Sequence, residues 1–298
     1  MELVATLITD PDREDLTERK VTTVLDALKA SGWSASPASW LNSNVACDIF
    51  FHGATLEEAR DIARRDFSNT AFDLVIQPAE NRRRMLLLAD MDSTIVVGET
   101  LDELADKAGI KDQVAEITAR AMRGELDFKA ALFERVNMLK NLPVDRLDQT
   151  LAGIILTQGA RTLVQTMRAH GAYTVLVSGG FRFFTRHVAA ITGFHEDHAN
   201  DLIIENERLT GRVAEPILDR ETKLALLNRY VAERKIPLSA SLTTGDGAND
   251  LPMIQAAGLG VAYHAKPVVE AEAPAAIRNG DLTALLYLQG YKFSEFRN

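Results

Sequence analysis

The feature that most constrains this 298-residue chain is an apolar run that ends in two carboxylates. Residues 85–89, Met-Leu-Leu-Leu-Ala, are followed at once by Asp-Met-Asp-Ser-Thr at 90–94. The run predicts a buried strand, and carboxylates beside such a strand are costly unless a cation, hydrogen bonds or chemistry compensates them. Because ligands bind at the strand ends of open α/β sheets, Asp90 and Asp92 predict a ligand site. An Asx turn that only ends the strand is the alternative.

Two carboxylates at this spacing suit phosphoryl transfer. A carboxylate such as Asp90 can act as a nucleophile and accept a phosphoryl group, which gives an aspartyl-phosphate. Asp92, two positions further on, can then shuttle the proton that the leaving group needs. We therefore predict catalytic roles for both residues.

The pattern from residue 85 onward predicts an α/β sheet. Strands and helices alternate there, which is typical of a mostly parallel sheet. The predicted strands are 85–89, 173–177, 241–244 and 259–263, and the predicted helices are 162–169, 183–191, 223–234 and 250–257. A helical insertion of about 99–154 follows the first strand, and its length predicts a lid or cap. Residues 201–213 alternate around a turn and predict a β-hairpin.

The first 80 residues follow a different order. Strands are predicted at 3–8, 33–40, 45–51 and 72–77, and helices at 16–31 and 56–67. The order βαββαβ matches the ferredoxin-like motif. The polar, proline-containing stretch 78–84 is the predicted boundary, which divides the chain into a separately folded domain at 1–80 and a second domain at 81–298. Its Arg-Arg-Arg run at 82–84 is interpreted as the solvated end of a linker rather than a phosphate-binding patch.

Composition excludes several classes of function. The formal net charge of −9 argues against bulk nucleic-acid binding, which needs a basic face. No stretch approaches the ~18 apolar residues of a membrane span, and the N-terminus has no signal-peptide pattern. Cys47 is the only cysteine, so no internal disulfide is possible and we expect a reducing, cytoplasmic location. His195 and His198 are interpreted as surface residues of a loop rather than a metal pair.

Two further positions carry groups that could bind phosphate. The predicted strand 173–177 runs into Ser178, Gly179 and Gly180, whose hydroxyl and amides are suited to phosphate oxygens, although a plain turn is equally consistent. Lys223 opens a predicted helix and could neutralise phosphate charge. Taken alone, it is better explained as solvated surface.

The predicted strand 241–244 runs into Gly-Asp-Gly-Ala-Asn-Asp at 245–250. This pattern places Asp246 on a loop and Asn249 and Asp250 at the start of a helix, where Asp250 could act only as a cap. Together with Asp90 and Asp92, these side chains collect oxygen ligands. Mg²⁺ prefers an oxygen shell with one or two carboxylates, waters and a substrate phosphate, so we predict a Mg²⁺ site.

In chain order, these motifs resemble the haloacid dehalogenase (HAD) superfamily. The matching features are Asp-x-Asp-x-Thr at 90–94, Ser178-Gly179, Lys223 and Gly-Asp-Gly-x-Asn-Asp at 245–250. The resemblance is closer still to its phosphoserine phosphatase family, because Glu99 follows the first motif and Gly-Glu-Leu-Asp-Phe at 124–128 precedes Glu134 and Arg135. The resemblance covers about 85–290. It implies a Rossmann-like core with a helical cap and Mg²⁺-dependent hydrolysis of O-phosphoserine to serine and phosphate, the last step of serine biosynthesis.

The resemblance also implies a role for each site residue. Asp90 would be the nucleophile and Asp92 the acid and base. The Mg²⁺ ligands would be a side-chain oxygen of Asp90, the backbone carbonyl of Asp92 and Asp246, with outer support from Asp250. The phosphoryl oxygens would be held by Ser178, Gly179 and Lys223, with Asn249 nearby. Glu99 and Arg135 would bind the substrate amine and carboxylate, and an ion pair within the lid is the alternative for these two.

Other functions stay open at this stage. Residues 1–80 resemble amino-acid-binding ACT regulatory domains in topology only, so dimerisation, with a homodimer as the product, is as consistent as serine sensing. A phosphatase or phosphotransferase for another small amino-acid-like monophosphate would need the same core residues. An inactive amino-acid sensor is disfavoured, because such a protein should have lost Asp90 or Asp92.

Overall fold

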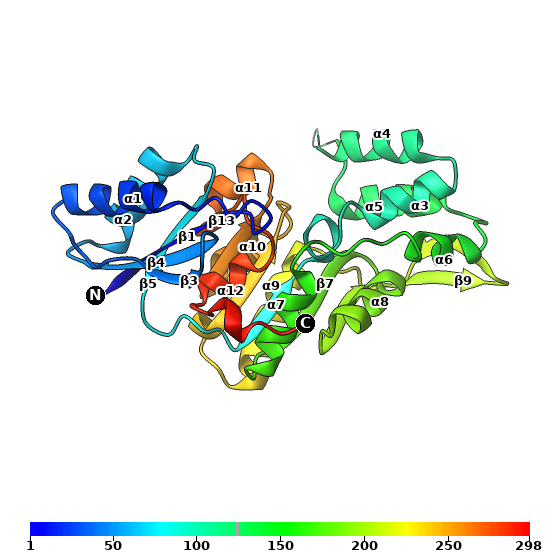
Figure 1. Cartoon of the computed structure of the whole chain (residues 1–298). Helices are drawn as coiled ribbons and strands as arrows, with labels where there is room; N and C mark the ends of the chain where they lie inside the picture. Colours follow the sequence, from blue (N-terminus) through cyan, green and yellow to red (C-terminus); the bar gives the residue numbers. More distant parts are fainter. Residues whose placement is uncertain (123–124) are drawn as a thin grey trace.

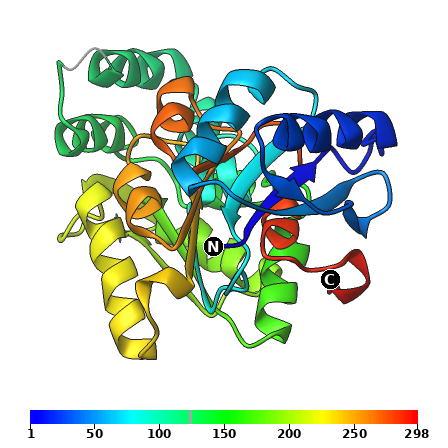
Figure 2. The same ribbon diagram turned by 90° about the vertical axis from the view of Figure 1, so that its left-hand side faces the viewer.

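The computed structural model describes residues 1–122 and 125–298 and contains two main sheets. In Figure 1 the N-terminal sheet with its two helices lies at one end of the molecule, and the helical insertion with the hairpin lies at the other. Figure 2 shows the same arrangement from the N-terminal side. Across the described ranges, no helix is both long and apolar enough to cross a membrane.

The N-terminal unit is an antiparallel sheet with two helices. Its strands run in the order β2-β4-β1-β5, and β3 also pairs with β4. The predicted strand 33–40 is interrupted, because Pro37, which has no backbone N–H, lies between β2 and β3. The elements are β1 (Leu3–Ile8), α1 (Glu18–Ala30), β2 (Ser34–Ala35), β3 (Ser39–Asn42), β4 (Ala46–His52), α2 (Leu56–Phe67) and β5 (Asp73–Pro78).

The second sheet is parallel, with the strand order β13-β12-β11-β6-β7-β8. Alternate residues of the central strand β6 face opposite cores. Leu87 packs on the side of α7 (Ala160–Ala169), α8 (Arg182–Thr192) and α12 (Ala284–Leu288), and Leu88 on the side of α9 (Arg220–Arg234) and α10 (Leu251–Ala256). The four predicted strands are confirmed. The strands are β6 (Leu86–Ala89), β7 (Tyr173–Phe181), β8 (Glu196–Asn200), β11 (Ser241–Gly245), β12 (Leu259–Tyr263) and β13 (Ala275–Ile277).

Four helices that cover the parallel sheet, α7 to α10, agree with the sequence prediction to within a few residues, whereas the short helices α11 and α12 were not predicted. The helices that cover the sheet are α7 (Ala160–Ala169), α8 (Arg182–Thr192), α9 (Arg220–Arg234), α10 (Leu251–Ala256), α11 (Pro267–Glu272) and α12 (Ala284–Leu288). The insertion contains α3 (Thr100–Lys107), α4 (Lys111–Met122), α5 (Phe128–Met138) and α6 (Asp145–Leu151). The predicted hairpin is present as β9 (Leu202–Glu205) and β10 (Arg208–Val213), and its Leu209 exchanges backbone hydrogen bonds with Asn141 and Leu142 after α5.

The edge strand β8 was missed because its residues are mostly polar. The interpretation of His195 and His198 as loop surface is therefore wrong for His198, which lies in β8 and is half-buried. Its Nε2 atom lies 2.6 Å from the hydroxyl of Tyr230. Strand β13 was missed because it has only three residues.

The segment between the two units is not a solvated linker. Arg82 is only 8% exposed, and each nitrogen of its guanidinium donates a hydrogen bond. Two of these bonds, of 2.6 and 3.0 Å, reach the buried carboxylate of Asp48, and others reach Thr6 and the carbonyl oxygen of Leu288. Arg84 is buried as well, and Arg83 alone is exposed. The linker interpretation of this run is therefore wrong.

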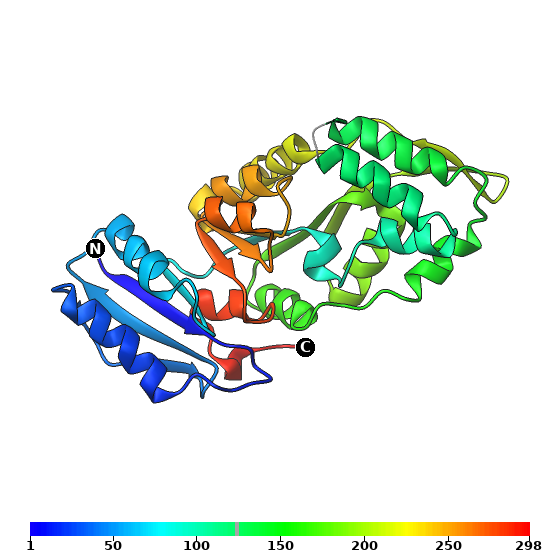
Figure 3. The same cartoon turned by 90° about the horizontal axis from the view of Figure 1, so that it is seen from above.

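A second contact joins the units through Asp73 at the start of β5. Its buried carboxylate accepts hydrogen bonds from the backbone N–H groups of Arg278, Asn279 and Gly280, at 2.8–3.2 Å. Figure 3 shows the C-terminal segment, in red, between the N-terminal unit and the rest of the molecule. The two sheets are thus held together by buried polar contacts.

Candidate active site

The polar residues that follow β6 and β11 meet those in the last part of β7 at one edge of the parallel sheet. They line a pocket of about 320 Å³ between the sheet and the helical insertion. Eight of the predicted site residues line it: Asp90, Asp92, Glu99, Arg135, Ser178, Gly179, Asp246 and Asn249. The other two, Lys223 and Asp250, are fully buried and contact Asp90 or each other. The structure therefore brings together all ten residues that were predicted for the site.

A buried lysine lies among the carboxylates at the base of the pocket. Lys223 is 1% exposed, and its Nζ donates to Asp90 Oδ1 at 2.5 Å and to Asp250 Oδ1 at 2.6 Å. Burial alone would lower the pKa of Lys223, but the charges of Asp250 and Asp90 raise it above its usual range. The lysine is thus a fixed cation of the site, and its interpretation as solvated surface is wrong.

The carboxylates outnumber that cation. Asp90, Asp246 and Asp250 each offer an oxygen, and these oxygens lie within 4.8 Å of one another. Burial, followed by the charge of Asp250, raises the pKa of Asp90 well above its usual range and that of Asp246 to about 6. Such a cluster fits a divalent cation, which would neutralise the excess charge with the oxygen ligands it prefers. The side chain of Asp250 accepts hydrogen bonds from Lys223 and from the N–H of Gly247 and does not cap α10.

Asp92 is held by three hydrogen bonds. Its Oδ1 accepts from the backbone N–H and the hydroxyl of Thr100, at 2.8 and 2.7 Å, and its Oδ2 accepts from the hydroxyl of Ser178 at 3.0 Å. The Ser178 oxygen in turn accepts the N–H of Gly180 at 2.8 Å. The carboxylate is therefore fixed in position beside Asp90. Thr100 was not identified from the sequence, because a threonine at the start of a helix has many ordinary explanations.

Gly179 lies under the helical insertion. Its carbonyl oxygen accepts from Asn200 at 2.8 Å, and a Cβ atom at this position would lie 3.3 Å from the ring of Phe128. Phe128 begins α5 in the insertion, at the end of the predicted lid motif. Gly124, the first residue of that motif, lies outside the described residues. A side chain at Gly179 would narrow the gap between the insertion and the sheet.

Glu99 and Arg135 face the same pocket without pairing. The ion pairs of the described ranges include none between them. Glu99 accepts a hydrogen bond of 2.9 Å from Ser93, and Arg135 uses Nε to bond the carbonyl oxygen of Ala131 at 3.2 Å. Burial, followed by the charge of Asp92, raises the pKa of Glu99 to about 7, and burial lowers the pKa of Arg135. An ion pair within the lid is therefore not what the structure contains, and both groups are available to a ligand.

Lys266 is a further pocket residue that the sequence analysis missed. Its backbone N–H donates to the carbonyl oxygen of Asp246 at 3.3 Å, and its side chain lines the pocket. The positive charge lowers the pKa of Asp246 against the larger effect of burial. No motif in the sequence marks this lysine, which lies in the loop after β12.

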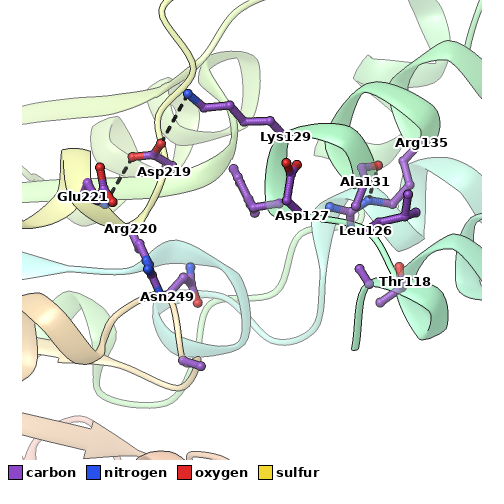
Figure 4. Close-up of a pocket in the computed structure, with 13 residues that line it drawn as sticks. Thr118, Leu126, Asp127, Lys129, Ala131, Arg135, Asp219, Arg220, Glu221 and Asn249 are labelled. Carbon is purple, nitrogen blue, oxygen red and sulfur yellow. Dashed lines mark hydrogen bonds and ion pairs between the residues drawn. The ribbon is translucent and has the colours of Figure 1, made fainter. Parts of the chain in front are cut away.

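A wider cleft of about 710 Å³ adjoins the pocket. It lies between the insertion and the start of α9, and Figure 4 shows the side chains that line it. The cleft and the pocket share Phe128, Arg135, Ala248 and Asn249. Lys129 of α5 spans the cleft, with Nζ 3.7 Å from Asp219 Oδ2 at the start of α9 (Figure 4). The shared residues thus make the cleft continuous with the pocket.

The comparison with known families agrees with this geometry. The sequence profile of the haloacid dehalogenase-like hydrolases matches residues 87–255, which cover most of β6 and all of β7 and β11. The chain belongs to this family of hydrolases.

Individual relatives are similar over most of the chain. A phosphoserine phosphatase of Archaeoglobus fulgidus is 42% identical over 230 residues, which are 76% of this chain and 67% of the relative. A phosphoserine phosphatase of Streptococcus thermophilus is 45% identical over 197 residues, which are 66% of this chain and 92% of the relative. The crystal structure of a probable phosphoserine phosphatase from Vibrio cholerae has 29% identity and a TM-score of 0.78, and it covers 99% of this chain and 88% of that one.

Proposed function

We propose that this protein is a phosphoserine phosphatase, a phosphoric monoester hydrolase that converts O-phosphoserine to serine and phosphate. The observation that carries the proposal is one pocket with two kinds of recognition. Its base holds Asp90 beside the buried Lys223, which suits a phosphoryl group. Its wall holds Glu99 and Arg135, opposite charges that are not paired with each other and suit a zwitterionic amino acid.

The reaction would proceed in two steps. In the first, a carboxylate oxygen of Asp90 attacks phosphorus, and the bond between phosphorus and the serine oxygen breaks. Asp92 gives a proton to that oxygen, because serine alkoxide is a poor leaving group. In the second, water attacks the aspartyl-phosphate and Asp92 takes a proton from it, which releases phosphate. Thr100 and Ser178 orient Asp92 for both transfers.

The cofactor we propose is Mg²⁺. Asp90, the backbone carbonyl of Asp92 and Asp246 would hold it, with Asp250 behind them, and it would supply positive charge against the phosphoryl oxygens. The cluster of Asp90, Asp246 and Asp250 supports a divalent cation at this place. Lys223, Ser178, Gly179 and Asn249 would hold the phosphoryl oxygens.

Substrate selection would depend on Glu99 and Arg135. The ionised Glu99 would accept the substrate ammonium, and the Arg135 guanidinium would donate to the substrate carboxylate. Ser93 would position Glu99 through their hydrogen bond. The presence of both Asp90 and Asp92 argues against an inactive amino-acid sensor.

Residues 1–80 would form an ACT-like unit that dimerises or senses serine, residues 81–298 the phosphatase unit, and residues 99–154 a cap over the pocket. The helices α3–α6 and their contact with Gly179 through Phe128 support the cap. A homodimer stays a prediction that sedimentation would test.

A phosphate-release assay would test the function. The substrates are O-phosphoserine, O-phosphothreonine, phosphoglycolate and an aryl phosphate, each with Mg²⁺ and with a chelator. We expect O-phosphoserine to be hydrolysed with the highest kcat/KM and all activity to need the divalent ion. Equal use of phosphoglycolate, which lacks the amine, would contradict the substrate, and full activity with the chelator would contradict the cofactor.

A further inference from the structure

Lys266 lines the active-site pocket, and the reaction proposed above gives it no role. The residue lies in the loop between β12 and α11, directly before Pro267. Its backbone N–H donates to the carbonyl oxygen of Asp246 at 3.3 Å, and its own carbonyl oxygen accepts from the N–H groups of Val269 and Glu270, at 2.8 and 3.1 Å. The backbone of Lys266 is therefore fixed beside the loop that carries Asp246.

The ammonium group of Lys266 is not paired with a carboxylate. The residue is exposed, and its side chain forms no ion pair or hydrogen bond with any residue of 1–122 or 125–298. Its positive charge still acts on Asp246, whose pKa it lowers. Lys223, in contrast, is buried and donates to two carboxylates. Lys266 thus brings to the pocket a positive charge that is free to meet a ligand.

The charges of the site explain why this additional cation matters. The ionised aspartates of the metal site are Asp90, Asp246 and Asp250. Lys223 and a divalent ion together neutralise these three charges, if Asp92 is protonated for the first step of the reaction. The phosphate group of a monoester carries close to two negative charges at neutral pH, and a neutral site does not attract it. Lys266 adds the positive charge that does.

We propose that Lys266 is a further substrate-binding residue, whose ammonium group attracts the phosphate group of the substrate into the pocket and binds inorganic phosphate before its release. The phosphate is the better partner than the substrate carboxylate, because Lys266 is bonded to the Asp246 loop, whereas Arg135 lies in the insertion. The residue takes no part in the chemical step, since Lys223 already contacts Asp90. Because the phosphate is that of the proposed substrate, this role depends on the phosphatase function proposed above.

Steady-state kinetics of Lys266→Gln would test this role, since the substitution removes the charge and keeps the backbone N–H. At low ionic strength we expect kcat/KM for O-phosphoserine to fall about tenfold through KM, with no fall in kcat. Lys266→Arg should restore most of the loss. The loss should shrink as sodium chloride is added, because salt screens the attraction in the wild type. The matched control is Lys29→Gln, an exposed change of the same charge on α1, which should behave like the wild type.

Titration calorimetry would give a measurement that does not depend on turnover. With saturating Mg²⁺, inorganic phosphate should bind Lys266→Gln about tenfold more weakly than the wild type. Mg²⁺ alone should bind the variant at least as tightly, because a positive charge beside Asp246 has been removed. Weaker binding of Mg²⁺ would show that the substitution disturbs the Asp246 loop, and it would overturn the role of Lys266 in binding phosphate.

The outcomes separate this role from the function of the enzyme. Wild-type KM and phosphate affinity in Lys266→Gln, an equal loss in Lys266→Arg, or a loss that salt does not change would overturn the role of Lys266 and leave the phosphatase function intact. A wild-type protein that binds phosphate through Lys266 without hydrolysing O-phosphoserine would support this role and overturn the proposed substrate.

Discussion

Lys223 and Arg82 are both buried cations that bind carboxylates. Only around Arg82 does the negative charge of the carboxylates equal the positive charge of the cation, so that the cluster is balanced. Arg82 meets one carboxylate, Asp48, and its remaining donors reach neutral oxygens. Lys223 contacts two carboxylates, those of Asp90 and Asp250, and the carboxylate of Asp246 lies in the same cluster of oxygens. The balanced cluster joins two units of the fold. The unbalanced one has the negative charge to attract a metal ion and the perturbed pKa values that accompany catalysis.

The difference teaches how a buried charge can be interpreted. A fully paired ion contributes specificity of packing and leaves nothing for a ligand. A cluster with surplus charge is costly in the free protein, and a cation or a substrate relieves that cost when it binds. The following predictions test each side of this contrast.

Asp90→Asn should have the largest effect. Turnover should fall on the order of 10⁴-fold or more, because an amide cannot attack phosphorus. Stability should not fall with it. The raised pKa of Asp90 means that its ionised form is disfavoured in the folded protein, so the ionised carboxyl lowers stability at neutral pH.

The checks are phosphate release and a melting temperature at pH 7. The melting temperature of Asp90→Asn should equal or exceed that of the wild type, and any gain should disappear in acid, where Asp90 is protonated in both states. Asp26→Asn serves as the control for the removal of an exposed charge. A large loss of stability would contradict the account, because it would show that the charges around Lys223 are balanced in the same way as those around Arg82.

Arg82→Met should show the opposite pattern, with lost stability. It leaves the carboxylate of Asp48 buried without its cation, which costs about 3–5 kcal/mol. Urea unfolding should show a lower midpoint, and the folded fraction should keep its kcat. The matched control is Arg83→Met, because Arg83 pairs with Glu295 at the surface and should contribute at most about 1 kcal/mol. An equal loss of stability in Arg82→Met and Arg83→Met would contradict the structural role given to the buried pair of Arg82 and Asp48.

Arg135→Ala and Glu99→Gln should lower the activity toward O-phosphoserine selectively. Each removes a charged partner from a closed site, which should cost on the order of 2–5 kcal/mol in kcat/KM for O-phosphoserine. The kcat/KM for an aryl phosphate should fall much less, because this substrate has neither amine nor carboxylate. Steady-state kinetics with both substrates would decide, and equal losses would assign the two residues to structure.

Ser93→Ala should have the smallest effect. It removes the hydrogen bond to Glu99, so we expect KM for O-phosphoserine to rise about tenfold with kcat little changed. In the wild type, KM should fall as the pH rises through about 7, because Glu99 must be ionised to accept the substrate ammonium. In Ser93→Ala this fall should move to higher pH, since the hydroxyl lowers the pKa of Glu99. An unmoved profile would exclude Ser93 from this role.

The cluster at the candidate active site was predictable from sequence because its residues lie at strand ends. Asp90 and Ser178 each follow an apolar run and Asp246 follows the predicted strand 241–244, and parallel strands bring such ends together. Thr100 and Lys266 were not predictable, since one hydroxyl or one lysine beside a helix carries no positional signal.

The contact between the two units could not be predicted from the sequence, and the reason differs from the one for Thr100 and Lys266. Arg82 stands in a run of three arginines, which is typical of exposed chain, and its partner Asp48 lies 34 residues away in a central strand of another sheet. Only the docking of the two units buries the pair. Strand β8 was not predicted either, because an edge strand needs no continuous apolar run.

The central claim is that the surplus charge around Lys223 serves covalent chemistry on Asp90, and trapping the intermediate tests it most directly. The enzyme would be mixed with O-phosphoserine and Mg²⁺, quenched in acid within the first turnover, digested and analysed by mass spectrometry. We predict that the peptide containing Asp90 gains the mass of one phosphoryl group and that the gain disappears after further turnover. Full phosphate release with no phosphorylated peptide, or with the phosphoryl group on another residue, would contradict the account.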